Sequence, residues 1–297
     1  MIPLRPLGRT GLSVSALGFG GATIGFADRA DERRAEFVAL VRAAADLGVT
    51  FFDTAPDYRD SEAVLGEALA GRADVAVATK VGRTHHRDGG GWRVVEDWSP
   101  AAITASVEAS RRILGVGALD LVQLHSPPRH VIEDGEALRA LERCRERGQV
   151  KHVGISVDGE DAVRALELGS FETLQTSYSL LQQQPGRDLI RLAEAQGVGV
   201  IAKQPLANAV MTLPERPPHP DWSWKWDLAQ RMVWPQPAPA DRISWALRWV
   251  LSAPGVASAI VGSASLGNLQ RNVANAGVPA PEWVYAAGAR AWDEGMA

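Results

Sequence analysis

The sequence has little cysteine, no excess of positive charge and no long hydrophobic run. Cys144 is the single cysteine among 297 residues, which excludes a disulfide framework and a cysteine metal site, and we expect no metal. The formal net charge of -4 offers no basic field to attract nucleic acid. No uncharged apolar run reaches the roughly 20 residues of a membrane-spanning helix, and the first eight residues lack the apolar stretch of a signal peptide. These absences predict a cytoplasmic protein with neither nucleic acid nor membrane as a partner.

What the sequence does contain is a repeated alternation of two kinds of segment. Short runs rich in Val, Ile, Leu and Phe alternate with longer stretches of helical period, as is typical of parallel strands covered on both faces. The expected strands are residues 16–20, 49–53, 75–80, 119–125, 150–156, 173–175, 198–203 and 257–261. The expected helices are residues 32–47, 61–69, 100–114, 133–147, 161–168, 185–196, 241–251 and 265–275.

Eight strand and helix units joined by right-handed crossovers predict a closed (β/α)8 TIM barrel, of class α/β, as a single domain over residues 1–297. An N-terminal hairpin around residues 8–11 and a C-terminal extra helix at residues 281–297 complete the expected fold. Ser99 before Pro100 is typical of a helix start, and Gly115 stands where a left-handed helix end is favoured. The glycines at residues 18–21 lack the third glycine of a dinucleotide fingerprint, which disfavours a Rossmann domain.

Two segments interrupt this rhythm. Residues 89–98 are expected to form a flexible loop after the third strand, and residues 213–239 form a long connection after the seventh, with seven prolines and four tryptophans. Trp222 and Trp224 either pack this connection onto the barrel or line a pocket for an apolar, aromatic or sugar-ring substrate, with Trp92 opposite. The same two interpretations apply to Trp226, Trp234 and Trp98, whereas Trp245 and Trp249 are expected in the core.

Polar residues at the carboxyl ends of barrel strands are the candidates for chemistry. Asp53, Tyr58, Lys80 and His125 occupy such positions, and they are expected to meet in one mouth. Taken singly, each has a structural interpretation: a helix cap, a loop aromatic, a strand-end charge and a rim histidine. Taken together, they place a phenol beside a cation, and we expect Lys80 paired with Asp53 to lower the pKa of Tyr58 from its ordinary ~10. That arrangement predicts the proton donor that carbonyl reduction needs.

A succession of motifs resembles the aldo-keto reductase family over nearly the whole chain. The segment F-D-T-A-P-D-Y-R-D-S-E at residues 52–62 is similar to the main signature of the family, and R-P-L-G-R-T-G-L-S-V-S at residues 5–15 is similar to its opening hairpin. Further matches follow in order at residues 65–66, 78–80, 106–115, 120–125, 154–156, 174–175, 199–206 and 261–263, and at Asn272.

The resemblance implies an NAD(P)H-dependent oxidoreductase that interconverts a small aldehyde or ketone and its alcohol. In it Tyr58 is the general acid or base, Lys80 and Asp53 tune it, and His125 orients the carbonyl. Gln175 holds the carboxamide of the cofactor, and the loop after the last strand receives its phosphates. The implied cofactor contacts are Gly20, Gly21, Asp53, Ser156, Gln175, Lys203, Leu206, Gly262, Ser263, Ser265 and Asn272. The expected substrate contacts are Tyr58, His125, Trp92, Trp222 and Trp224.

Departures from the family pattern leave the cofactor and the substrate open. Arg271 is the only cation in residues 262–272, where the family often places an arginine for the 2′-phosphate, so NADPH/NADP is expected and NADH/NAD is the alternative. Val157 replaces a common asparagine, and Lys203 replaces a common aromatic residue. Lys203 either approaches phosphate or is a strand-end charge. Arg59 follows Tyr58 where glycine is frequent, which narrows or charges the mouth.

Other functions are weighed against this one. A sugar or alcohol dehydrogenase using NAD is the alternative within the family, and a nicotinamide-nucleotide-sensing subunit without turnover is the alternative outside catalysis. The intact set of Asp53, Tyr58, Lys80 and His125 disfavours the sensor. A barrel lyase or hydrolase requires a metal cluster or paired carboxylates, and the pair at residues 85–86 is too isolated to serve as one. The sequence specifies neither the natural substrate, nor the direction of reaction, nor the oligomeric state.

Overall fold

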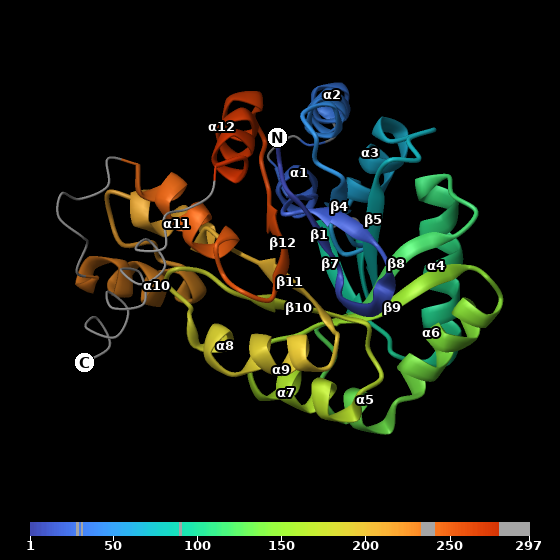
Figure 1. Ribbon diagram of the computed structural model, residues 1–297. Helices are drawn as coiled ribbons and strands as arrows, with labels where there is room; N and C mark the ends of the chain where they lie inside the picture. Colours follow the sequence, from blue (N-terminus) through green and yellow to red (C-terminus); the bar gives the residue numbers. More distant parts are fainter. Residues whose placement is uncertain (28–29, 31, 89–90, 233–240, 279–297) are drawn as a thin grey trace.

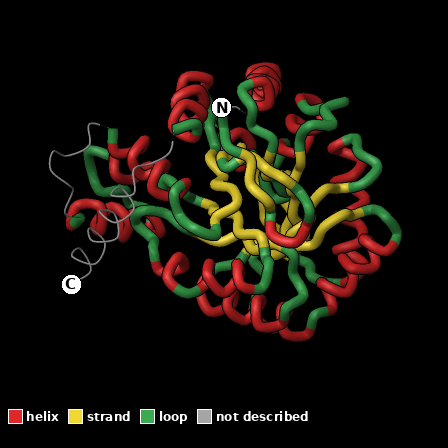
Figure 2. The backbone as a smooth tube through the Cα atoms, in the orientation of Figure 1, coloured by secondary structure: helices red, strands yellow, loops and turns green. Residues whose placement is uncertain are grey.

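The centre of the molecule is a closed barrel of eight parallel strands with helices around it (Figure 1). A computed structural model describes all residues except 28–29, 31, 89–90, 233–240 and 279–297. The tube trace in Figure 2 shows the strands inside a ring of helices, so the predicted (β/α)8 TIM barrel is confirmed. In spatial order the barrel strands are β10 (Thr173–Ser177), β11 (Gly199–Lys203), β12 (Val256–Val261), β3 (Leu17–Gly20), β4 (Phe51–Asp53), β5 (Ala76–Val81), β8 (Leu119–His125) and β9 (Val150–Ser156).

Burial on both faces explains the composition of these strands. Every residue of β3, β4, β10 and β12 is buried, so apolar residues follow one another without alternation in β3, β4 and β12, whereas β10 carries buried polar residues. All neighbouring strands pair in parallel, and β9 pairs with β10 to close the barrel. The carboxyl ends of all eight strands therefore open at one end of the barrel, where the polar residues that terminate them gather.

The helices follow the predicted order, with two differences. Ser99 caps α4 by accepting the N–H of Ala102 at 3.3 Å, and Gly115 ends that helix in the left-handed region, as predicted. The helix predicted at residues 133–147 is two helices, because Gly135 has a φ of 68° and interrupts the turn. The helix predicted at residues 185–196 also divides, at Asp188. The helices flanking the barrel are α1 (Ala22–Gly25), α2 (Arg34–Asp46), α3 (Ser61–Ala68), α4 (Pro100–Leu114), α5 (Arg129–Asp134), α6 (Glu136–Glu146), α7 (Gly159–Leu168), α8 (Gln184–Arg187), α9 (Leu189–Ala195), α11 (Arg242–Leu251) and α12 (Leu266–Ala276).

The predicted N-terminal hairpin is present and closes the amino end of the barrel. Strands β1 (Leu4–Pro6) and β2 (Ser13–Ser15) pair antiparallel across the short 3-10 helix η1 (Gly8–Thr10). Leu7 and Val14 are fully buried in a cluster with residues from the barrel interior. This plug leaves the opposite, carboxyl end of the barrel as the accessible one.

Residues 91–96 contradict the prediction of a flexible loop at residues 89–98, of which 89–90 lie outside the described residues. They form β7 (Gly91–Glu96), which pairs antiparallel with β6 (Arg83–Asp88) in a second hairpin after β5. Its first strand reads R-T-H-H-R-D, so no apolar alternation indicates a strand. The two strands pair with each other and form a separate sheet, which the composition of either one alone does not predict.

The tryptophan-rich connection also contains an element that the sequence analysis treated as loop. Helix α10 (Pro220–Arg231) begins with proline at its first position, and His219 caps it by accepting the N–H of Asp221. Apart from Pro220, the prolines of this connection precede the helix or follow it in the sequence. Trp234 and the predicted C-terminal helix at residues 281–297 lie outside the described residues. The 3-10 helix η2 (Ala207–Thr212) links β11 to this region.

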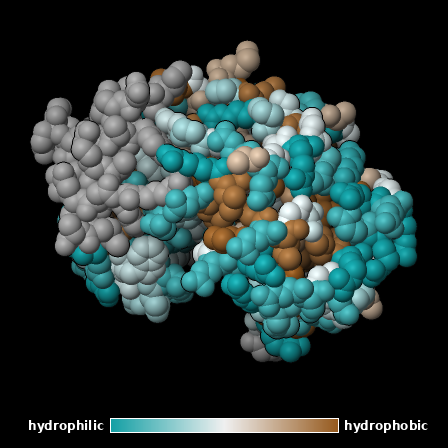
Figure 3. All heavy atoms as spheres, turned by 60° about the horizontal axis from the view of Figure 1, so that its bottom comes forward, coloured by the Kyte–Doolittle hydropathy of each residue, from teal (hydrophilic) through white to brown (hydrophobic). Residues whose placement is uncertain are grey.

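The surface is mainly hydrophilic around the helical rim. On the face drawn in Figure 3, hydrophilic side chains surround a more apolar centre. Within the described residues, no helix has the length and apolarity needed to cross a bilayer.

Candidate active site

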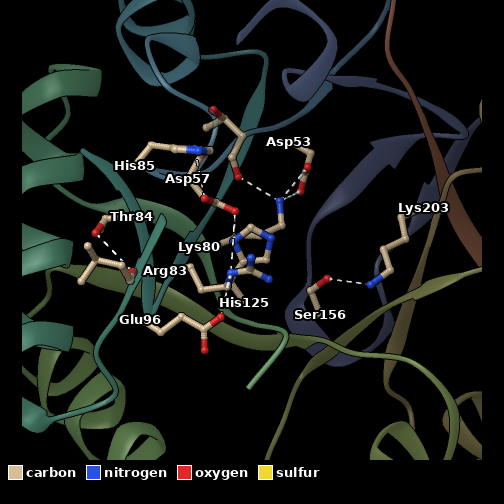
Figure 4. A network of polar contacts seen from close by, with 12 residues as sticks. Asp53, Asp57, Lys80, Arg83, Thr84, His85, Glu96, His125, Ser156 and Lys203 are labelled. Carbon is tan, nitrogen blue, oxygen red and sulfur yellow. Dashed lines mark hydrogen bonds and ion pairs between the residues drawn. The ribbon is translucent and has the colours of Figure 1, made fainter. Parts of the chain in front are cut away.

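Three of the four predicted catalytic residues stand on adjacent barrel strands, and the fourth follows one of them. Asp53 ends β4, Lys80 lies near the end of β5, and His125 ends β8. Tyr58 lies in the connection between β4 and α3. The Nζ atom of Lys80 is 4.8 Å from the centroid of the Tyr58 ring, and the rings of Tyr58 and His125 meet edge to face at 5.6 Å. The structure therefore brings all four together (Figure 4 labels three of them).

Lys80 is held firmly by its neighbours. Its ammonium donates to both carboxylate oxygens of Asp53, at 2.8 and 2.7 Å, and to the carbonyl of Thr54 at 2.9 Å. These three hydrogen bonds use all three N–H groups of the ammonium. Lys80 thus acts on Tyr58 through its charge and not by donating a hydrogen bond to the phenol. The Lys80 side chain is fully buried, so its field is weakly screened.

The pKa of Tyr58 does not follow the prediction. We expected Lys80 to lower it, but burial of the phenol raises its pKa well above the ordinary value of 10.0, and the charges of Asp53 and Asp57 raise it further. Arg83 opposes this shift. The carboxylate that holds Lys80, Asp53, is itself one of the charges that raise this pKa. Tyr58 is consequently a protonated phenol across the neutral range.

Burial also shifts the two neighbouring bases. It lowers the pKa of Lys80 from 10.5, although the Asp53 carboxylate opposes the shift. It lowers the pKa of His125 well below 6.5, and the positive charges of Lys80, Arg83 and Lys203 add to the effect. His125 is therefore a neutral imidazole at neutral pH, able to donate or accept one hydrogen bond at each ring nitrogen according to its tautomer.

A layer of buried polar contacts supports these residues from α3. Glu62 accepts a hydrogen bond at 2.6 Å from Thr79, the residue directly before Lys80. Thr54 donates to Ser61 at 2.9 Å. Burial raises the pKa of Glu62, against the effect of its hydrogen-bond donors. Gly21 belongs to the same layer, because a Cβ there would lie 2.2 Å from the Ser61 hydroxyl oxygen. The small size of Gly21 thus has a packing reason.

A second polar cluster adjoins the site, and the sequence analysis gave its members no role there. Asp57 is buried, and its carboxylate oxygens lie 3.1 Å from Nδ1 of His85 and 3.9 Å from Nδ1 of His125. Arg83 places its Nε 3.8 Å from the same carboxylate (Figure 4). Arg83 and His85 come from β6, so recognising the hairpin is the step that would have found them.

The residues predicted to hold the nicotinamide end of a cofactor lie at the same end of the barrel. Gln175 donates to Asp53 at 2.8 Å, and Ser156 is buried at the end of β9. Lys203 lies 3.4 Å from the Ser156 hydroxyl and 3.1 Å from an Asp158 carboxylate oxygen. The ion pair with Asp158 supports the interpretation of Lys203 as a strand-end charge, while its position leaves it adjacent to Ser156.

The predicted phosphate loop follows β12 and ends at the start of α12. Ser265 caps this helix by accepting the N–H of Asn268 at 3.3 Å, and Ser263 bonds to the backbone of Ser265 in both directions. Asn272 is buried within the helix. A Cβ on Gly20 would lie 3.3 Å from the N–H nitrogen of Gly262, so β3 and the loop approach closely. Leu206 lies apart from this loop, directly before η2.

Two arginines border this loop, one of them from a distant segment. Arg271 bonds to Asn268 at 2.9 Å within α12. Arg33, which precedes α2, donates to the carbonyl of Ala264 at 3.4 Å and pairs with Glu36. The sequence alone indicates only Arg271, the cation inside the loop segment. The approach of Arg33 to this loop is a tertiary feature.

Some tryptophans pack in the interior, and others lie at the rim of the barrel. Trp245 and Trp249 are buried in α11, as predicted, and the indole of Trp226 donates to the carbonyl of Leu213. Trp222 and Trp224 are 39% and 43% exposed on α10. A further tryptophan stands on β7 near the catalytic candidates: the ring of Trp92 is 5.9 Å from that of His85. Among the described residues no group of three or more metal-binding side chains occurs.

Comparison with known proteins agrees with this geometry. A closed parallel barrel with ionisable side chains at the carboxyl ends of its strands is the arrangement of TIM-barrel enzymes. A profile of the aldo/keto reductase family matches residues 16–288. The chain belongs to this family, as its motifs predicted, and it is an oxidoreductase.

Individual relatives show how broad this family is. The chain is 30% identical to the L-galactose dehydrogenase of Arabidopsis thaliana, over 92% of this chain and 88% of the relative. It is 29% identical to the NADH-specific methylglyoxal reductase of Escherichia coli strain K12, over 70% and 68% of the two chains. A crystal structure of an aldo-keto reductase from Klebsiella pneumoniae in complex with NADPH superimposes with a TM-score of 0.75 at 26% identity, covering 98% of this chain and 96% of that one.

Proposed function

We propose that the protein interconverts an aldehyde or ketone and its alcohol, with Tyr58 as the general acid and base. The observation that carries this proposal is the convergence of Tyr58, His125 and the Lys80–Asp53 pair at the open end of the barrel. Tyr58 is the one member of this group whose raised pKa keeps a transferable proton in place at neutral pH. In reduction it protonates the carbonyl oxygen, and in oxidation it accepts the proton of the alcohol.

The other three residues position the reacting oxygen and stabilise its charge. Neutral His125, next to the phenol ring, donates a hydrogen bond to the carbonyl oxygen and fixes its direction toward Tyr58. Lys80 supplies a fixed positive charge 4.8 Å from the ring, which stabilises the phenolate left after proton transfer. Asp53 holds Lys80 in place and keeps it ionised against the effect of burial.

The residues at hand also fit a nicotinamide cofactor, which supplies or accepts the hydride when bound. The loop at residues 262–265 leads into the amino end of α12, where free backbone N–H groups and the helix dipole favour phosphate. Gln175, which donates to Asp53, and Ser156 are proposed to bind the carboxamide. The further residues proposed to hold the cofactor are Gly20, Gly21, Lys203, Leu206, Gly262, Ser263, Ser265 and Asn272.

NADPH is the proposed cofactor, with NADH as the alternative. Arg33 and Arg271 flank the loop and provide positive charge for a 2′-phosphate, but each already has an acceptor, Glu36 and Asn268 respectively. An NADH-specific reductase and an NADPH complex both occur among the relatives. Trp92, Trp222 and Trp224 are the proposed aromatic contacts of the substrate. Their rings suit apolar, aromatic or sugar-ring groups.

A panel of aldehydes, ketones and alcohols, assayed with NADPH and with NADH at the nicotinamide absorbance, tests the proposal. We expect the wild type to turn over at least one small aldehyde. Tyr58→Phe removes the transferable proton and keeps the ring contacts, so we expect a loss of at least about 100-fold in kcat, in line with the typical contribution of general acid catalysis.

The control for Tyr58→Phe is cofactor binding, which is measured by the quenching of tryptophan fluorescence. It should be unchanged, because the hydroxyl has no place in the proposed cofactor contacts. A Tyr58→Phe variant with wild-type turnover would show that another group donates the proton. Cofactor binding without turnover of any panel member by the wild type would instead support a nucleotide sensor.

A further inference from the structure

One cation at the rim of the site has no carboxylate within ion-pair distance in the described part of the chain. Arg59 follows Tyr58, and the central carbon of its guanidinium lies 5.2 Å from the centroid of the Phe26 ring and 5.3 Å from that of Trp92. Its Nε atom is buried and has no hydrogen-bond partner within the described part of the chain. Buried donors are rarely left unsatisfied, and nothing among the described residues occupies this one. The Nε atom of Arg83 also has no hydrogen-bond partner among these residues, but it lies within ion-pair distance of two carboxylates.

The neighbouring cations are balanced by carboxylates. Lys80 is bound by Asp53, and Arg83 lies between Asp57, at 3.8 Å, and Glu96, at 3.5 Å. Of the three cations Lys80, Arg83 and Arg59, only Arg59 has no carboxylate within ion-pair distance among the described residues. The unbalanced positive charge of this part of the rim therefore resides on Arg59.

The backbone at this position is strained. Arg59 has a φ of 50°, in the left-handed region that a bulky side chain rarely occupies. Such strain persists where the surrounding structure holds it, and it is concentrated at functional sites. The conformation directs the guanidinium to the space between a residue of the β3–α2 connection, Phe26, and a residue of β7, Trp92.

The rings around Arg59 connect it to the reacting group. Phe26 lies 5.7 Å from the ring of Tyr58 and 5.5 Å from that of His85, and His85 lies 5.9 Å from Trp92. We name Phe26, His85 and Trp92 the aromatic collar. Phe26 therefore contacts both the Arg59 guanidinium and the ring of Tyr58. An anionic group on Arg59 would thus be at the far end of a substrate whose carbonyl reaches Tyr58.

We propose that Arg59 binds a carboxylate at the end of the substrate remote from the carbonyl, while the aromatic collar contacts the apolar part between them. The substrate class is therefore an aldehyde or ketone that also carries a carboxylate. A guanidinium suits this role because it binds both carboxylate oxygens at once and remains charged at every physiological pH. The inference rests on the proposed function, since it concerns the substrate of the same site.

Two substrates that differ in one charge test it: 4-carboxybenzaldehyde and its methyl ester. For the wild type we expect kcat/KM to favour the carboxylate by about tenfold, the size of one charge-assisted hydrogen bond. Arg59→Gln should abolish this preference through KM, leaving kcat for the ester within about twofold of wild type. Arg59→Lys should restore part of it. Binding of benzoate compared with benzamide to the NADP-loaded protein, measured by calorimetry, should show the same order.

The matched control is Arg87→Gln. Arg87 also lies over the Trp92 ring, at 5.8 Å, so its removal costs a similar aromatic contact without touching the Arg59 position. We expect the preference to persist in this variant. Equal use of both aldehydes by the wild type, or equal losses for both in Arg59→Gln, would overturn the proposal and make Arg59 a packing residue. If neither aldehyde is turned over, the proposed function is in doubt. The benzoate and benzamide affinities then decide the role of Arg59 by themselves.

Discussion

At the scale of single residues, the environment of Tyr58 reverses a simple expectation. A cation near a phenol lowers its pKa in isolation, but here burial, together with the charges of Asp53 and Asp57, raises the pKa of Tyr58. The site is therefore arranged to keep the proton on the tyrosine. This favours proton donation at neutral pH and makes proton acceptance the step that depends on alkaline conditions.

The pH profile of the two directions should reflect this arrangement. Reduction needs protonated Tyr58 and neutral His125, so kcat/KM for a neutral aldehyde should stay level between about pH 6.5 and pH 10. Oxidation needs the phenolate, so its kcat/KM should rise through the same range without a plateau. Steady-state assays of one aldehyde and its alcohol in overlapping buffers measure both.

A variant of Asp57 gives the profile an internal control. Asp57→Asn removes a charge that raises the pKa of Tyr58, so the alkaline rise in oxidation should move to lower pH. A reduction profile that declines with a midpoint near pH 8 in the wild type would contradict the raised pKa.

At the scale of elements, the β6–β7 hairpin joins the fold to the candidate site. It supplies Arg83, His85 and Trp92, and Gly82 joins the end of β5 at Val81 to the start of β6 at Arg83. Gly82 has a φ of 94°, and a Cβ there would lie 2.0 Å from the Trp98 ring. The Trp98 indole therefore packs against a position that only glycine can occupy without displacement.

Gly82→Ala should destabilise the protein and disturb the site together. Strain at positive φ costs about 1–3 kcal/mol, and displacement of Trp98 adds to it. Gly115→Ala is the matched control, because its φ is 70° and a Cβ there meets nothing within 4 Å. We expect urea unfolding to show a larger loss for Gly82→Ala, and KM for an aldehyde to rise in that variant alone. Equal losses in both would mean that the Trp98 contact carries no energy.

At the scale of the whole molecule, the proposed cofactor contacts link segments far apart in the chain. Residues 20–21, 156, 175 and 262–272 come from four different strand ends, and Arg33 approaches the last of these segments from before α2. A ligand that binds such a set only in the folded state stabilises the entire barrel.

Cofactor binding should therefore raise the melting temperature. At 100 times the dissociation constant the gain is about 2.7 kcal/mol, or roughly 4 °C for a domain of this size. Differential scanning fluorimetry with NADPH and NADH measures it, and 2′,5′-ADP compared with ADP reports on the 2′-phosphate alone. We expect the larger shift with NADPH, reduced by Arg33→Gln and by Arg271→Gln. The absence of a shift with either cofactor would count against the proposed nucleotide site.

The sequence by itself determined the eight strands, most of the helices around them, the N-terminal hairpin and the family. These features are local or periodic: buried parallel strands give continuous apolar runs, and caps such as Ser99 and Gly115 mark helix ends. The convergence of Asp53, Lys80 and His125 followed as well, because the carboxyl ends of barrel strands share one face.

Only the tertiary structure decided what surrounds those residues. The β6–β7 hairpin has no apolar alternation, so its pairing, and with it the placement of Arg83, His85 and Trp92, depends on contacts between strands that composition does not encode. The pKa of Tyr58 is set by burial and by the sum of nearby charges, which require distances. Arg33 reaches the loop after β12 from another segment for the same reason: proximity across the chain is a property of the folded barrel.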